Sequence, residues 1–262
     1  MNRNPAITTA VRRSDQVLVE QIAVREALAC GYAYANADFP SVPQCHVLTE
    51  VMLEGDCSAV VETVDGYYRG RGARCGRWAP ARGQPVEPLE ALLRPAGFVR
   101  VESVALGYAP RVAPQPSGRF RILSGRAMSR AYASMVRERS APHGGLAAAL
   151  AAVQLERLDD AQYEPFVALD GDQPVGMAAL LHVGEIGRVC DVFVSPRARQ
   201  RGVASDLVAC ALRTALRWSI PMICAKAARD DAAGAALLRR AEFEECGTIA
   251  ALVRPEFFEV GG

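Results

Sequence analysis

The sequence has little of what metal sites, nucleic-acid binding and membrane attachment require. Its 262 residues include 3 histidines and a single lysine, Lys226, and the formal net charge is +1. The histidines, His46, His143 and His182, are too scattered for a zinc site. A net charge this small creates no overall field that would recruit nucleic acid or an anionic membrane. We therefore expect no metal, no nucleic-acid partner and no membrane partner.

The cysteines and the apolar runs exclude two further classes of protein, disulfide-rich secreted proteins and membrane proteins. The eight cysteines form no C-x-x-C pair and lie singly in apolar runs, as at Cys190 and Cys224, so we expect reduced thiols. The N-terminus lacks the apolar core of a signal peptide, and no run approaches the roughly 20 apolar residues of a membrane span. These absences favour a soluble cytoplasmic protein, with either a monomer or a homodimer open.

A proline-rich segment suggests two domains. Residues 109–118 hold three prolines and a glycine with almost no apolar content. Such composition is typical of a linker. We predict an N-terminal domain over 1–110, a linker over 111–118 and a second domain over 119–262.

The pattern in the second domain alternates strands and helices. We expect strands at 120–123, 166–169, 175–183, 187–194, 222–227 and 246–253, and helices at 129–139, 146–158, 203–218 and 232–241. This order predicts an α/β fold with a mixed central sheet and flanking helices.

The N-terminal half contains a weaker pattern and one repeat. We expect helices at 14–30, with Ser14 as a possible N-cap, 57–68 and 88–96, and strands at 46–53 and 99–108. The segment Leu92–Phe98 matches Leu237–Phe243 at five of seven positions, and both precede an expected strand. Either two short helices are alike by chance, or the fold is duplicated and its N-terminal copy has diverged.

The turn after residue 194 has the composition of an anion site. A strand ends at Val194, Pro196 blocks further pairing, and a helix begins near Val203. The first turn of a helix exposes unpaired amides and a positive dipole end, and Gly202 and Ala204 leave room for a ligand. Arginines at 197, 199 and 201 add donors. A solvated basic turn is the alternative, and neither a Walker A loop nor G-x-G-x-x-G is present.

This turn resembles motif A of the GNAT superfamily, the GCN5-related N-acetyltransferases, which reads Q/R-x-x-G-x-G/A after a V-x-P strand end. The matching residues are Val194-x-Pro196 and Arg199-x-x-Gly202-x-Ala204. The family's following motif is present in a degraded form, Asp231-x-x-Gly234-x-x-Leu237-Leu238-x-x-x-Glu242-Phe243. The segment 1–110 is similar, less specifically, to the degenerate N-terminal portion of two-domain GNAT proteins.

The resemblance implies a splayed central sheet with acetyl-CoA in the gap between the strands that end at Val194 and Ala227. It implies a tandem of two GNAT-like domains of which the first is degenerate. The backbone of Phe193 and Val194 would bind the pantetheine arm as an added strand does. The implied pyrophosphate-binding residues are Arg199, Gln200, Arg201, Gly202, Val203 and Ala204, and Asp231 is a further cofactor-binding candidate.

The catalytic groups have no sequence motif comparable with that of the cofactor turn. The family often uses a tyrosine acid where this chain has Leu238, and leucine has no proton to donate. Candidate general bases are Asp191, Glu185 and His182, each of which could equally be a structural residue of its strand or turn.

The function that the resemblance implies is transfer of an acetyl group from acetyl-CoA to a primary amine of a small molecule or amino acid. Two alternatives remain. One is a CoA-binding sensor or structural protein that has lost catalysis, which the leucine at position 238 favours. The other is a protein or peptide N-acetyltransferase.

Overall fold

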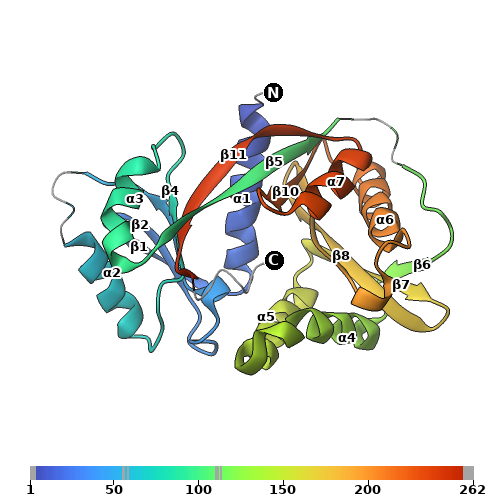
Figure 1. Ribbon diagram of the computed structural model, residues 1–262, viewed down its shortest axis with the longest axis horizontal. Helices are drawn as coiled ribbons and strands as arrows, with labels where there is room; N and C mark the ends of the chain where they lie inside the picture. The colour runs from blue at the N-terminus through green and yellow to red at the C-terminus, as the bar shows by residue number, and fades with distance from the viewer. Residues whose placement is uncertain (1–3, 55–56, 58, 110–111, 113, 256–262) are drawn as a thin grey trace. The chain divides into compact units, whose positions relative to one another are not determined.

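The computed structural model describes residues 4–54, 57, 59–109, 112 and 114–255 (Figure 1). Contacts divide the chain into unit 1, made of Met1–Ser14 and Val104–Thr248, and unit 2, made of Asp15–Ser103 and Ile249–Gly262. Helix α1 (Pro5–Glu20) and strands β5 (Val99–Tyr108) and β11 (Phe243–Val253) each belong partly to both units. The division predicted at 111–118 therefore stays a prediction.

Unit 1 contains a mixed sheet with the strand order β11-β5-β10-β9-β8-β7-β6. Its other strands are β6 (Arg121–Ser124), β7 (Tyr163–Asp170), β8 (Gln173–Val183), β9 (Ile186–Val194) and β10 (Met222–Ala228), and its helices are α4 (Ser129–Ser140), α5 (Ala147–Glu156), α6 (Val203–Arg217) and α7 (Ala232–Arg240). Strands β6 to β9 are antiparallel neighbours, whereas β9 and β10 run parallel with α6 between them in the chain. The mixed α/β fold predicted from the sequence is confirmed.

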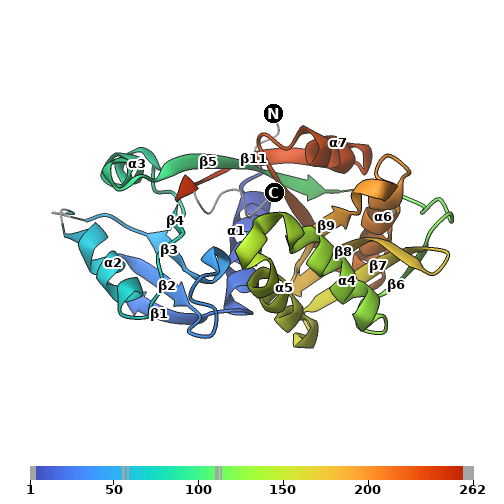
Figure 2. The same ribbon diagram turned by 60° about the horizontal axis from the view of Figure 1, so that its bottom comes forward.

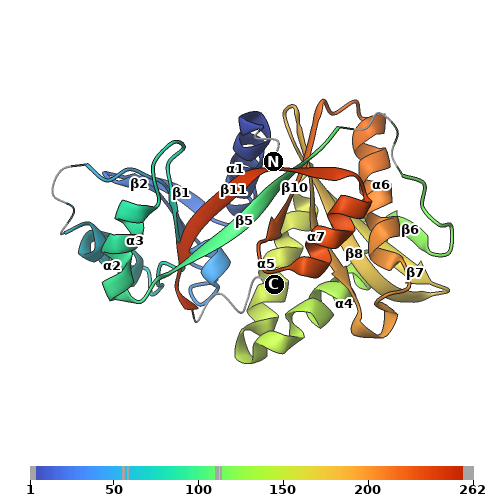
Figure 3. The same ribbon diagram turned by 45° about the horizontal axis from the view of Figure 1, so that its top comes forward.

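Strand alternation assigns the helices of unit 1 to the two faces of its sheet. Val189 of β9 and Phe166 of β7 belong to one core with Leu207 of α6 and Leu238 of α7. Helix α4 contacts the same strands β7 and β8, and Val167, next to Phe166, is also buried. Because successive strand residues point to opposite faces, α4 and α5 cover the face away from α6 and α7 (Figures 2 and 3).

Two glycines let the first half of α1 lie directly on the sheet of unit 1. A Cβ atom on Gly107 of β5 would lie 2.9 Å from Cγ1 of Ile7, and one on Gly247 of β11 would lie 2.6 Å from Oγ1 of Thr8. The amide of Asn4 donates to the carbonyl of Cys246 at 3.1 Å. The first half of α1 is therefore part of the unit that carries the predicted cofactor turn.

Unit 2 has the strand order β1-β2-β3-β4-β11-β5. Its own elements are β1 (Val24–Leu28), β2 (Gly31–Ala35), β3 (Val47–Val51), β4 (Arg77–Pro80), α2 (Val60–Arg69) and α3 (Glu87–Leu93). Residues of both helices pack with Trp78 and Leu252 in one core. Tyr34 of β2 packs instead with Val19 of α1, so α1 covers the other face.

The two units repeat one succession of elements. In each, three consecutive antiparallel strands (β1 to β3; β7 to β9) lead through a helix (α2; α6) to a strand parallel to the last of them (β4; β10), and a second helix and a long strand follow. The first strand of each parallel pair carries an acidic residue at positive φ, Glu50 at 51° and Asp191 at 53°. The repeated segments Leu92–Phe98 and Leu237–Phe243 fall at equivalent places, before β5 and β11. This correspondence supports the predicted duplication.

The segment of unit 2 that corresponds to the predicted cofactor turn lacks the sequence of an anion site. The segment that joins β3 to α2 spans 52–59, contains Glu54 and Asp56 and has no arginine. The equivalent segment in unit 1 is basic. The segment before α2 therefore lacks the arginines that accompany the predicted pyrophosphate turn of unit 1.

The helix predicted over 14–30 is wrong at both ends. Helix α1 spans Pro5–Glu20, and strand β1 follows from Val24. The Asn4 side chain accepts a hydrogen bond from the Ala6 amide at 3.1 Å, and Pro5 occupies the first turn, where its missing N–H costs nothing. Ser14 is not a cap but lies inside the helix and donates to the carbonyl of Val11.

Candidate functional site

Strands β9 and β10 separate part-way along their length. Their parallel register covers four pairs, from Ile186 with Met222 to Val189 with Ala225, although β9 continues to Val194. At Asp191 the backbone adopts φ 53°, and the register of β9 on β8 shifts between Met177 and Ala179. This β-bulge turns the end of β9 away from β10 and produces the splayed strands that the resemblance implies.

The turn after β9 presents the start of α6 to a ligand. Gly202 has φ 91° and precedes the first helical residue, Val203, and no side chain caps the helix. A Cβ atom on Gly202 would meet nothing within 4 Å, so the space beside these amides is open. Gln200 also has a positive φ, 59°. Unpaired amides, a positive dipole end and open space together suit a phosphate group.

The arginines of the turn are held in different ways. Arg201 donates to Asp170 at 2.6 Å, and Arg197 donates to the carbonyl of Pro174 at 3.2 Å, so both contact the β7–β8 hairpin. Arg199 is exposed, with Nε 3.5 Å from the carbonyl of Val194. Phosphate binding by the residues from Arg199 to Ala204 stays a prediction. Among the groups of this turn, the backbone amides have the geometry that best suits a phosphate.

The residues of the second predicted motif have structural roles. Asp231 is the N-cap of α7, and its Oδ1 accepts from the amide of Gly234 at 2.8 Å. Leu238 is buried in the core together with Phe243. The position at which the resemblance places a tyrosine acid therefore faces the protein interior, and the part of Asp231 in cofactor binding stays a prediction.

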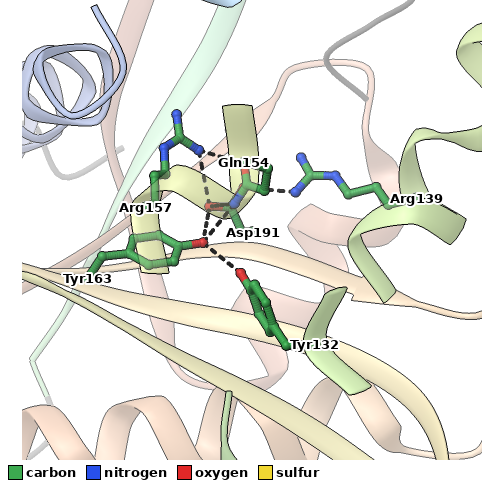
Figure 4. Close-up of polar contacts among 6 residues, drawn as sticks. All are labelled: Tyr132, Arg139, Gln154, Arg157, Tyr163 and Asp191. Carbon is green, nitrogen blue, oxygen red and sulfur yellow. Dashed lines mark hydrogen bonds and ion pairs between the residues drawn. The ribbon is translucent and has the colours of Figure 1, made fainter. Parts of the chain in front are cut away.

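A cluster of polar side chains surrounds the bulge of β9. Its members are Tyr132 and Arg139 of α4, Gln154 of α5, Arg157, Tyr163 of β7 and Asp191 of β9 (Figure 4). Arg139 donates to Oδ1 of Asp191 at 2.8 Å, and Tyr163 and Gln154 donate to its Oδ2 at 2.7 and 3.2 Å. Arg157 lies 3.7 Å from Oδ2 and donates to Oε1 of Gln154 at 2.7 Å. The carboxylate thus ties both helices to the sheet.

The hydroxyl groups of the cluster have fixed roles. Tyr163 gives its only hydroxyl proton to Asp191, so Tyr132, 3.0 Å away, must be the donor to Tyr163. Burial, followed by the charge of Asp191, raises the pKa of Tyr132 to about 12 and raises that of Tyr163 well above its usual value. Both phenols therefore stay protonated as hydrogen-bond donors at neutral pH.

The surroundings of Asp191 make it a weak proton acceptor. Burial alone would raise the pKa of its carboxyl, but Arg139 and Arg157 outweigh burial and hold that pKa well below its ordinary value. A general base needs a pKa near the working pH. Its role as the base stays a prediction, and the geometry favours a role in holding the bulge.

The other two candidate bases lie at the opposite end of β9 from the cofactor turn. Glu185 is exposed in the β8–β9 turn, and Nε2 of His182 lies 2.7 Å from the carbonyl of Gly184. The ring of His182 packs against that of Trp218 at 5.9 Å. The structure brings neither side chain to the gap between β9 and β10, so their catalytic roles remain predictions without geometric support.

Comparison with known proteins agrees with this geometry. The family model described as the acetyltransferase (GNAT) family matches residues 132–250. That range contains the separated strands, the turn and the polar cluster. Residues 132–250 therefore belong to the GNAT family.

Solved structures share the fold over most of the chain. A GCN5-related N-acetyltransferase from Kribbella flavida superposes with a TM-score of 0.66 at 15% identity, covering 94% of this chain and 95% of its own. A functionally unknown protein from Staphylococcus epidermidis also gives 0.66 at 15%, covering 88% and 94%. A GCN5-related N-acetyltransferase from Sphaerobacter thermophilus gives 0.59 at 16%, covering 85% and 76%. No curated protein matches the sequence.

The described residues contain neither a cluster of metal ligands nor a membrane-spanning helix. No group of three or more histidine, cysteine, aspartate or glutamate side chains among them could hold a metal ion. Within the same part of the chain, no helix is both long and apolar enough to cross a bilayer. All eight cysteines are free thiols.

The sequence contained a weak signal for the polar cluster of the GNAT domain. Tyr132 and Arg139 are seven residues apart, and Gln154 and Arg157 are three apart, so each pair shares a helix face. What could not be foreseen is that both faces meet the same carboxylate. That meeting depends on the long-range packing of α4, α5 and β9.

Replacing Asp191 by asparagine is expected to destabilise the GNAT domain by about 3–5 kcal/mol at pH 7, because the nearly buried guanidinium of Arg157 and the partly exposed one of Arg139 lose their shared anion. The native pKa of Asp191 lies below the unfolded value of about 3.9. Its stabilisation is therefore complete above that value and is lost as the pH falls toward the native pKa. Urea unfolding at pH 7 and pH 3 measures both effects.

The matched control for this variant is Asp172→Asn. That carboxylate is 96% exposed and pairs with Arg121 at 3.2 Å. It is expected to change stability by less than about 1 kcal/mol. Equal destabilisation of the Asp191 variant at pH 7 and pH 3 would contradict the ion-pair account.

Proposed function

We propose that the chain is an N-acetyltransferase that transfers an acetyl group from acetyl-CoA to a primary amine of a small molecule or amino acid. The observation that carries the proposal is the separation of β9 and β10 beside the open, uncapped start of α6 at Gly202. An extended pantetheine arm needs free strand backbone, and a pyrophosphate needs free helix amides. The free strand backbone and the free helix amides both occur here, in the segment from Phe193 to Ala204.

Each part of the turn has a separate task in this proposal. Phe193 and Val194 are partly exposed residues at the end of β9, and their backbone binds the arm. The amides from Arg199 to Ala204 bind the pyrophosphate. The bulge at Asp191 sets the direction in which β9 leaves its neighbour, and the Arg139 and Arg157 contacts hold it there.

In the reaction, the nitrogen of a neutral amine attacks the thioester carbonyl carbon. A C–N bond forms, the C–S bond breaks with its electron pair on sulfur, and the ammonium proton leaves to solvent. Because Leu238 is apolar and buried, the sulfur leaves as thiolate or takes a proton from water. Thiolate is a good leaving group, so the missing acid slows the reaction without preventing it.

The buried Leu238 favours one alternative, a CoA-binding protein without catalysis. Turnover of acetyl-CoA on a panel of small amines, amino acids and peptides, beside calorimetric binding of CoA, separates the two. We expect micromolar or tighter CoA binding and turnover on at least one small amine. Tight binding with no turnover on any amine would overturn the enzyme, and turnover on peptides alone would point to a protein N-acetyltransferase.

A further inference from the structure

Arg139 is held at Nη1 of its guanidinium, and part of its side chain reaches the surface. Its Nη1 donates to Oδ1 of Asp191 at 2.8 Å, while 30% of its side chain is exposed. Arg157, which also pairs with Asp191, is only 11% exposed. The two arginines therefore share a partner but not an environment.

The second edge of the Arg139 guanidinium is available to a ligand. Within the part of the chain that the structure describes, Nε and Nη2 of Arg139 have no hydrogen-bond partner. A guanidinium presents its donors in a planar fork that matches a carboxylate with two parallel hydrogen bonds. Because Asp191 already holds Nη1 of the group, a ligand has less of the side chain to order, which lowers the entropic cost of binding.

The Nε and Nη2 edge of Arg139 lies on the side of the strands from which an acceptor must approach. Asp191 lies two residues before Phe193, beyond the last pair between β9 and β10. The amine has to reach a thioester in that gap. Helix α4 covers this face of the strands, and Arg139 is in its last turn. A small acceptor at the gap is therefore within reach of Arg139.

The charges on this side of the sheet favour an anionic group. Burial raises the pKa of the Cys190 thiol and Asp191 adds to the rise, while Arg188, Arg157 and Arg139 oppose it, so three arginines gather near one point of β9. The carboxylates of Asp191 and of Glu138, which accepts a hydrogen bond from the Ser195 hydroxyl at 2.6 Å, offset two of the three positive charges and leave an excess of positive charge. A polycationic amine would be repelled from such surroundings, whereas a carboxylate would be attracted.

We propose that Arg139 binds the carboxylate of the acceptor, so that the substrate class is amino acids and related amines that carry a carboxylate. The inference rests on the proposed acetyl transfer and narrows its acceptor. Arg139 takes no part in bond making. It holds the acceptor so that the amine faces the thioester.

The test compares amino acids with their carboxamides as acceptors, for the wild-type chain and Arg139→Gln. We expect the wild type to prefer the acid, and Arg139→Gln to lose about 100-fold of that preference, mainly through KM. Comparing each variant's acid-to-amide ratio with the wild-type ratio cancels the different basicity of the two amines. Arg139→Lys, which keeps a cation at this position, should retain part of the preference.

The matched control is Tyr163→Phe. This change removes the 2.7 Å hydrogen bond to Asp191, and Tyr163 is fully buried, so its hydroxyl does not reach an acceptor. It is expected to lower the melting temperature and leave the acid-to-amide ratio unchanged. If Arg139→Gln lowers kcat/KM for both acceptors by the same factor, Arg139 is a structural tie and the proposal is overturned.

A binding measurement separates this proposal from the proposed function. Calorimetry of N-acetylated amino acids and their amides with the CoA-loaded chain needs no turnover. A preference for the acid that disappears in Arg139→Gln supports carboxylate binding by Arg139, even if no amine is acetylated. In that case the proposed function alone fails. Equal binding of the acid and the amide by the wild type overturns carboxylate binding by Arg139.

Discussion

The Gly202→Glu variant is expected to bind CoA at least about 100-fold more weakly than the wild type, a loss of about 3 kcal/mol. The new carboxylate would lie beside the first amides of α6, where the pyrophosphate is expected, and would repel it. Gly202 also has φ 91°, which L side chains rarely adopt, although open space means that no clash adds to the strain. Isothermal calorimetry with CoA measures the effect directly.

Two further variants separate charge from strain. Gly72→Glu places the same residue at φ 67° in equally open space within unit 2, so it shares the strain and the added charge and should keep full affinity. Gly202→Ala adds strain without charge and should weaken binding less than glutamate does. Micromolar affinity retained by Gly202→Glu would count against the cofactor site.

The sequence was most informative where local chemistry and periodicity agree. The turn from Val194 to Val203 combines a strand end, a proline, a left-handed glycine and a helix start, and each is a local property. Its predicted strand and helix boundaries are confirmed. The strand predicted over 99–108 is also confirmed, because its ends are set by Gly97 at φ 84° and by the proline-rich segment.

The sequence was least informative where exposure or distant contacts decide the structure. Strand β1 is almost wholly exposed and lacks alternation, so it resembled the end of a helix. The cluster around Asp191 joins residues as far apart as Tyr132 and Asp191, and no local pattern records their meeting. Of the candidate bases, proximity in sequence to Val194 favoured Asp191, but its two arginines are visible only in three dimensions.

The segment 99–108 shows that distant contacts also limit how well domain boundaries can be predicted from the sequence. Its place in the sequence suggested an N-terminal domain, yet the second half of β5 belongs to unit 1 and lies between β10 and β11. Leu106 and Tyr108 are buried in the core that contains Leu207 of α6. A strand inserted from a distant part of the chain leaves no mark in its own sequence.

Residues 119–262 produced alone are therefore expected not to fold cooperatively. Such a fragment lacks the strand between β10 and β11 and leaves two sheet edges unpaired. Exposing the partners of Leu106 and Tyr108 costs roughly 3–6 kcal/mol in lost burial, at about 1.5–3 kcal/mol for each large side chain. That loss is comparable with the whole stability of a domain, about 5–15 kcal/mol. The Ile7 and Thr8 contacts with β5 and β11 are lost as well.

Urea unfolding followed by circular dichroism, with CoA binding as a second readout, tests this expectation against a longer fragment. Residues 97–262 restore β5 and should regain a cooperative transition, whereas the same fragment with Leu106→Asp keeps the length but not the packing and should not. If residues 119–262 alone unfold cooperatively and bind CoA as the full chain does, the boundary predicted at 111–118 is correct and β5 is dispensable. If they do not, the cofactor site needs a strand from the N-terminal half, and the two halves of the sequence depend on each other to fold.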